Sequence, residues 1–210
     1  MEEYTLRSEV PRGKNRPAYK LKEGQVIFGF NVEKITKTDF MDITTYQLVH
    51  ELTGARYLHL DTSDLENSFA VLFRTPPDDH TGKPHVLEHL ATCGSEKFPV
   101  RDPFFAMMKR SLNTYMNAWT GMDFTMYPFA SQNKNDFENL MKVYTDFSFF
   151  PSLKKHDFMQ EGWRLEFENW NDTKSALTYK GVVYNEMKGA MSSPSEKFVY
   201  TLNEALFKKS

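Results

Sequence analysis

The chain has 210 residues, of which 40% are hydrophobic and 15% aromatic, so it can bury a substantial core and one domain is the default expectation. A formal net charge of −2 argues against a nucleic-acid partner, and no apolar run approaches the length that crosses a membrane. The single cysteine, Cys93, excludes an intrachain disulfide and is typical of a reducing compartment.

The chain begins with a polar stretch and then becomes rich in strand-forming residues. Pro11, Gly13 and Pro17 interrupt the first 22 residues, so we expect a loose leader followed by one domain over residues 23–210. β-Branched and aromatic residues bounded by turn residues predict the strands that come next. They are a strand over 26–30, a hairpin over 42–60 that turns at Thr53-Gly54, and a buried strand over 68–73.

In the rest of the chain, hydrophobic residues spaced three and four apart, with prolines near the boundaries, predict mainly helices. The expected helices cover residues 85–90, 104–112, 135–149, 157–165, 179–191 and 196–207, and two β segments cover 115–119 and 123–130. In the helix over 104–112 the expected core face consists of Phe105, Met108 and Leu112. Antiparallel strands that lead into helices, without a regular β-α-β alternation, predict an α+β domain in which an antiparallel sheet is layered with helices.

Residues 85–89 read His-Val-Leu-Glu-His. Positions three and four apart share a helix face, so His85, Glu88 and His89 point the same way. The apolar positions expected to anchor this helix in a core lie largely on the other side: Val86, Leu87 and Leu90. Two imidazoles one turn apart can hold a zinc ion, and the carboxylate between them can reach a water bound to it. This order is the inverted form of the commoner zinc-peptidase motif. The alternative is an amphipathic surface helix with a solvated His/Glu face.

A third ligand is expected in the helix over 179–191. By spacing, Glu186 shares one face of this helix with Val182, Val183 and Ala190. A carboxylate among apolar residues is costly to bury without a partner, and a zinc ion would be such a partner. Two histidines, one glutamate and a water form an established catalytic zinc set. The alternative is that Glu186 lies at a solvated rim.

Several longer blocks of sequence carry a resemblance to a known family. They are residues 54–60, 85–89, 93–99, 102–104, 111–118, 160–166 and 181–189. With these blocks the chain resembles the pitrilysin family of inverted zinc peptidases, and within it the mitochondrial, peptide-degrading branch. The resemblance implies a pitrilysin-like metallopeptidase domain with one Zn²⁺ per chain. In this reading His85, His89 and Glu186 bind the zinc ion, and Glu88 is the catalytic base.

The resemblance also implies a place for the substrate. In similar enzymes the stretch that here reads Asn117-Ala118-Trp119-Thr120 is an edge strand, which takes up an extended peptide by β-augmentation, with Asn117, Ala118 and Trp119 as the expected contact residues. Without the resemblance, Trp119 would be interpreted as a core aromatic and Asn117 as a turn residue. Glu161 and Glu166 are candidates for orienting the zinc ligands, with exposed surface carboxylates as the alternative for at least one of them.

The implied function is zinc-dependent endopeptidase cleavage of short unstructured peptides, such as cleaved mitochondrial targeting peptides, in the mitochondrial matrix. The N-terminus, however, does not resemble a transit peptide. Family members are much longer, and their second half closes a chamber over the substrate. We therefore expect an N-terminal portion of such an enzyme, with a sheet that is incomplete at its C-terminal end. The alternatives are a truncated, catalytically inactive zinc- or peptide-binding module and a scaffold subunit of the same fold.

Overall fold

The computed structural model of the protein describes residues 21–207, in two compact units that meet between Glu66 and Asn67. The leader expected over residues 1–22 lies almost entirely outside the described residues. Within the described part of the chain, no helix is long and apolar enough to cross a membrane.

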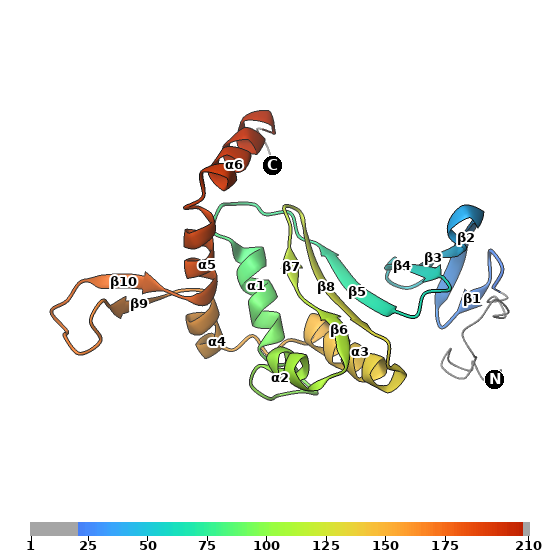
Figure 1. The fold of residues 1–210 in the computed structure, drawn as a ribbon, viewed down its shortest axis with the longest axis horizontal. Helices are drawn as coiled ribbons and strands as arrows, with labels where there is room; N and C mark the ends of the chain where they lie inside the picture. Colours follow the sequence, from blue (N-terminus) through green and yellow to red (C-terminus); the bar gives the residue numbers. More distant parts are fainter. Residues whose placement is uncertain (1–20, 208–210) are drawn as a thin grey trace. The chain divides into compact units, whose positions relative to one another are not determined.

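The first unit is a four-stranded antiparallel sheet in which each strand pairs with the next along the chain (Figure 1). Its strands are β1 (Val26–Ile27), β2 (Phe30–Thr38), β3 (Ile43–His50) and β4 (Arg56–Asp61), with a short 3₁₀ turn, η2 (Asp39–Met41), between β2 and β3. Val32, Tyr46 and Leu48 form its buried core. The expected hairpin over 42–60 is confirmed as β3 and β4.

The single strand expected over 26–30 is wrong. The chain reverses at Phe28 and Gly29, whose φ angles are +49° and +79°, so that Ile27 pairs with Phe30 across a tight turn. Because the apolar residues continue through this turn, the sequence pattern does not reveal it. The strand that follows, β2, carries charged and polar residues among its apolar ones and was not expected from the sequence.

The second unit is built on a sheet whose central strand is β8 (Phe124–Ser131). On one side β8 pairs with β5 (Asn67–Arg74); on the other it pairs with β6 (Asn113–Met116) and then β7 (Trp119–Thr120). The expected strand over 68–73 and the β segment over 123–130 are confirmed as strands. The first is not the buried strand that was expected, because every second residue of β5 is exposed and Leu72 is 59% exposed. The segment expected over 115–119 is interrupted, because the side chain of Asn117 accepts a hydrogen bond from the backbone N–H of Ala118 at 2.9 Å.

Helix α3 (Lys134–Phe149) packs on one face of this sheet. The side chain of Asn133 caps its first turn by accepting a hydrogen bond from the N–H of Asp136. Leu140, Tyr144 and Phe147 are fully buried against the sheet, and Phe129 of β8 lies among them. The helix predicted over 135–149 is therefore confirmed, together with its apolar face.

The remaining elements complete an α+β architecture, as predicted. They are α1 (Lys83–Thr92), α2 (Pro103–Arg110), α4 (Lys155–Glu161), β9 (Arg164–Phe167), β10 (Leu177–Lys180), α5 (Val182–Ala190) and α6 (Pro194–Leu206). Strands β9 and β10 form a hairpin that leaves the body of the second unit between α4 and α5 (Figure 1).

Two expected helices are too long because of this hairpin. The helix predicted over 157–165 ends at Glu161, and the helix predicted over 179–191 begins at Val182. Between them, residues 164–167 pair with residues 177–180 as antiparallel strands, and that non-local pairing overrides the helical spacing.

The predicted core face of α2 is also wrong. Phe104 is buried and Met107 packs against the same core, whereas Phe105, Met108 and Leu112 are exposed. Both faces of this helix are apolar, so spacing alone does not decide between them.

Candidate metal centre

Helix α1 turns its polar face toward the sheet. Glu88 is 6% exposed and Ala91 4% exposed, and the helix lies beside β7. Of the apolar residues expected to anchor the helix, Leu87 is 46% exposed, whereas Val86 and Leu90 are half-buried. A motif placed on the buried face of a helix is an arrangement typical of a functional site, because buried charges need specific partners.

The structure brings the two histidines of α1 together with Glu186 of α5. Oε2 of Glu186 lies 3.7 Å from Nε2 of His85 and 3.7 Å from Nε2 of His89. All three ligand atoms lie within 4.8 Å of one another. Ligand atoms bound tetrahedrally to zinc are about 3.4 Å apart, given bond lengths near 2.1 Å. A zinc ion therefore fits this set of nitrogen and oxygen donors with small side-chain adjustments.

Glu186 reaches this position from the rim of the site. Its side chain is 55% exposed, so it is not the buried carboxylate that the valines around it suggested. Helix α5 packs against α4 and α1, and it starts immediately after Gly181, which contacts the backbone of Gly162 so closely that a Cβ atom would not fit. This close approach holds the start of α5 against the end of α4.

Glu161, at the end of α4, contacts the other nitrogen of His89. Its Oε2 lies 3.1 Å from Nδ1 of His89, and its Oε1 accepts a hydrogen bond from Nε2 of Gln160 at 2.9 Å. Gln160 in turn accepts a hydrogen bond from Arg101 at 2.8 Å. Glu166, the other candidate for orienting the ligands, instead pairs with Arg164 and Lys180 in the β9–β10 hairpin.

These contacts shift the pKa values of both partners. Burial lowers the pKa of His89, but the hydrogen bond with Glu161 and the negative charges of Glu88, Glu161 and Glu186 outweigh burial and raise it. The hydrogen bond with His89 lowers the pKa of Glu161 despite its partial burial. The carboxylate of Glu161 can only accept, so Nδ1 of His89 carries the shared proton and Nε2 remains available as a ligand atom.

Glu88 has a partner that was not expected from the sequence. The hydroxyl of Thr120 in β7 donates a hydrogen bond to Oε2 of Glu88 at 2.6 Å. Thr120 was expected only as the last residue of the edge strand, and nothing in the sequence indicated a contact with Glu88.

The stretch Asn117-Ala118-Trp119 runs along the side of β8 that β6 and β7 share. The backbone N–H of Asn117 donates to the carbonyl of Pro128, and the hydroxyl of Tyr144 donates to the carbonyl of Asn117. Trp119 pairs with Met126 and is 46% exposed, so it is not a core aromatic. Within residues 21–207, no strand pairs with the outer side of β6 and β7.

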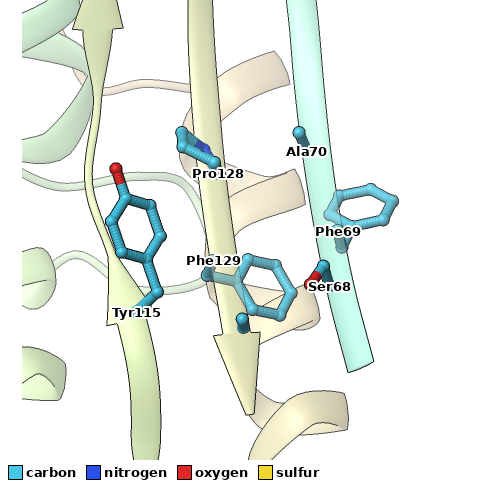
Figure 2. A pocket seen from close by; sticks show the side chains of 7 residues that line it. Ser68, Phe69, Ala70, Tyr115, Pro128 and Phe129 are labelled. Carbon is cyan, nitrogen blue, oxygen red and sulfur yellow. The ribbon is translucent and has the colours of Figure 1, made fainter. Parts of the chain in front are cut away.

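A separate shallow hollow lies on the sheet, shown in Figure 2. It has a volume of about 360 Å³ and is lined by Ser68, Phe69, Ala70, Tyr115, Pro128, Phe129 and Ala130. Side chains alternate along a strand, and Phe69 and Phe129 belong to the core under α3, so the small residues of this lining lie on the opposite face. No residue of the metal centre lines this hollow.

The fold and the site together define a class of protein. They combine an α+β domain, an inverted His-x-x-Glu-His helix and a glutamate from a second helix, as in metallopeptidases of the inverted type. Residues 74–194 match the insulinase family of peptidases, peptidase family M16. The chain belongs to this family.

Named relatives and a solved structure agree with this assignment. The mitochondrial presequence proteases of Mus musculus and Danio rerio are each 52% identical to the chain over 189 residues, which is 90% of the chain and 18% of those proteins. That of Saccharomyces cerevisiae is 47% identical over 184 residues, 88% of the chain and 19% of that protein. The crystal structure of pitrilysin superposes with a TM-score of 0.53 at 21% identity, covering 61% of this chain and 14% of that one. The chain thus spans about a fifth of the length of these curated relatives.

Proposed function

We propose that the chain carries the zinc site of an endopeptidase that cleaves short unstructured peptides. The observation that supports this proposal most directly is the convergence of three ligand-type atoms, from His85, His89 and Glu186, within 4.8 Å of one another. Glu88, the acidic residue of α1, shares a helix face with the two histidines and has the chemistry of a general base. Membership of a peptidase family makes hydrolysis of peptide bonds the reaction to expect of this set.

Each side chain has a distinct task in this proposal. A bound zinc ion would supply Lewis acidity, which lowers the pKa of a water and polarises a carbonyl group. Glu88 accepts the proton of the attacking water and delivers it to the amine that leaves. Glu161 holds His89 through its Nδ1–H and so fixes which nitrogen faces the metal position.

The outer side of β6 and β7 suits an extended peptide. A peptide that adds to this side would bind through main-chain hydrogen bonds, which impose little sequence preference. Asn117, Ala118 and Trp119 would contact it. The named relatives are mitochondrial presequence proteases, and we therefore propose cleaved mitochondrial targeting peptides as a substrate class and the mitochondrial matrix as the compartment.

We further propose that residues 23–210 serve as the metal-binding domain of a larger enzyme. The curated relatives are about five times as long as the matched segment. A second half of that kind would supply the polar groups that hold a peptide opposite the zinc ion and would close a chamber around it.

The test combines metal analysis with a cleavage assay on a fluorogenic peptide. We expect about one zinc ion per chain and at most weak cleavage of the peptide by residues 1–210 alone. The substitution Glu186→Ala should reduce zinc content, whereas the matched control Glu204→Ala, an exposed carboxylate on α6, should not. Zinc without cleavage would favour an inactive zinc- or peptide-binding module. Neither zinc nor cleavage would favour a scaffold subunit of the same fold.

A further inference from the structure

We propose that Thr120 is a positioning residue for Glu88, and that its hydroxyl holds one carboxylate oxygen so that the other faces the reacting water. This inference rests on the role proposed for Glu88. It is carried by the 2.6 Å hydrogen bond from Oγ1 of Thr120 to Oε2 of Glu88. Within residues 21–207, no other side chain hydrogen-bonds to the Glu88 carboxylate.

The environment of Glu88 makes this single hydrogen bond important. Glu88 is 6% exposed, and its helix neighbour Ala91 belongs to the apolar core. In such surroundings a hydrogen bond to a charged oxygen is worth more than one in water, and its loss leaves a buried charge unsatisfied. The last torsion of a glutamate side chain is broad and nearly two-fold, so the side chain by itself does not select one orientation of the carboxylate. The Thr120 hydroxyl selects it.

The position of Thr120 is itself well defined. Its backbone pairs with Thr125 of β8, and a β-branched side chain in a strand has few χ1 rotamers. The side chains of Thr120 and Trp119 lie on opposite faces of β7, because neighbouring residues in a strand alternate. Strand β7 would therefore have two tasks. Its outer side would contact a docked peptide, and its residue Thr120 orients Glu88, the proposed base.

Thr125 provides a matched control. It lies opposite Thr120 in the register and is 4% exposed, but its hydroxyl pairs with that of Thr75 at 2.8 Å and not with Glu88. The changes Thr120→Val and Thr125→Val remove the same atom from adjacent positions in the same sheet. Only the effect of Thr120→Val on stability should depend on whether Glu88 is present.

The first experiment is a double-mutant cycle on unfolding of the metal-free chain, which needs neither zinc nor substrate. All three tryptophans follow Asn67, so their fluorescence reports the second unit. Thr120→Val should lower the denaturant midpoint when Glu88 is present and change it little in a Glu88→Met background. Thr125→Val should lower the midpoint equally in both backgrounds. An equal effect of Thr120→Val in both backgrounds would overturn the proposal.

The second experiment measures cleavage of the fluorogenic peptide. Thr120→Val should reduce kcat about 10- to 100-fold, as expected for a misplaced catalytic group, with KM and zinc content unchanged. Thr120→Ser retains the hydroxyl and should restore most of the activity. The positioning role would be contradicted if Thr120→Val lowered kcat/KM through KM alone. It would also be contradicted if Thr120→Ser did not restore cleavage activity. Absence of cleavage by the unmodified chain would count against the proposed function, and the unfolding cycle would then decide the role of Thr120.

Discussion

Nδ1 of His89 lies 3.1 Å from Oε2 of Glu161, on the opposite side of the ring from Nε2, which faces Glu186. Glu161 of α4 and Glu186 of α5 therefore contact opposite sides of one histidine of α1. Partners of this kind fix the tautomer and orientation of a metal-binding imidazole.

Replacing Glu161 should weaken zinc binding. We expect Glu161→Gln to reduce zinc affinity about 10- to 100-fold, because the amide is a poorer acceptor for the Nδ1–H of His89. Competition with a chromogenic chelator measures the change. Glu166→Gln is the matched control: Glu166 pairs with Arg164 in the β9–β10 hairpin, so zinc affinity should stay as it is. Equal affinities for Glu161→Gln and the unmodified chain would contradict the contact's proposed role.

Replacing Glu88 should separate metal binding from turnover. Glu88→Gln removes the proton acceptor but none of the three proposed ligands, so we expect zinc content to be retained and peptide cleavage to fall about 100-fold or more. Metal analysis and the fluorogenic assay on the same sample check both statements. Glu96→Gln, an exposed carboxylate after α1, should leave both unchanged. Full activity of Glu88→Gln would show that another group is the base.

The core under α3 should be sensitive to loss of volume. Leu140 is fully buried, and Leu140→Ala is expected to lower the free energy of unfolding by about 2–5 kcal/mol, since it removes apolar contacts and leaves a cavity. Chemical denaturation followed by tryptophan fluorescence measures this change. Asn139→Ala alters the neighbouring, exposed position of the same helix and should have an effect within about 0.5 kcal/mol. Similar losses at both positions would show that α3 does not pack as described.

Cys93 should react slowly with thiol reagents in the folded chain. Burial raises its pKa to about 12, and its Sγ donates a hydrogen bond to the carbonyl of His89. The thiolate is the reactive form, so at pH 8 we expect the metal-free native chain to react about fiftyfold more slowly than the denatured chain. Raising the pH toward 12 should increase the native rate. Colorimetric thiol titration measures both, with Cys93→Ala as the blank, and equal rates would contradict the burial of this thiol.

Elements with a strong local pattern could be predicted from the sequence. Helix α3 presents Leu140, Tyr144 and Phe147 at helical spacing, and strand β5 contains a short run of apolar, strand-forming residues, so both were predicted to within a residue of their observed ends. The β9–β10 hairpin could not be predicted, because Leu165 and Tyr179 are paired across a long loop and their sequence segments also fit a helix.

The candidate site divides in the same way. The sequence by itself determined that His85, Glu88 and His89 share one face of α1, because the hydrogen bonds of a helix set the spacing of its side chains locally. Only the tertiary structure decided that this face points inward, that Glu186 meets it from an exposed rim and that Thr120 holds Glu88. These relations depend on how helices and strands pack, which the spacing of residues within one element does not encode.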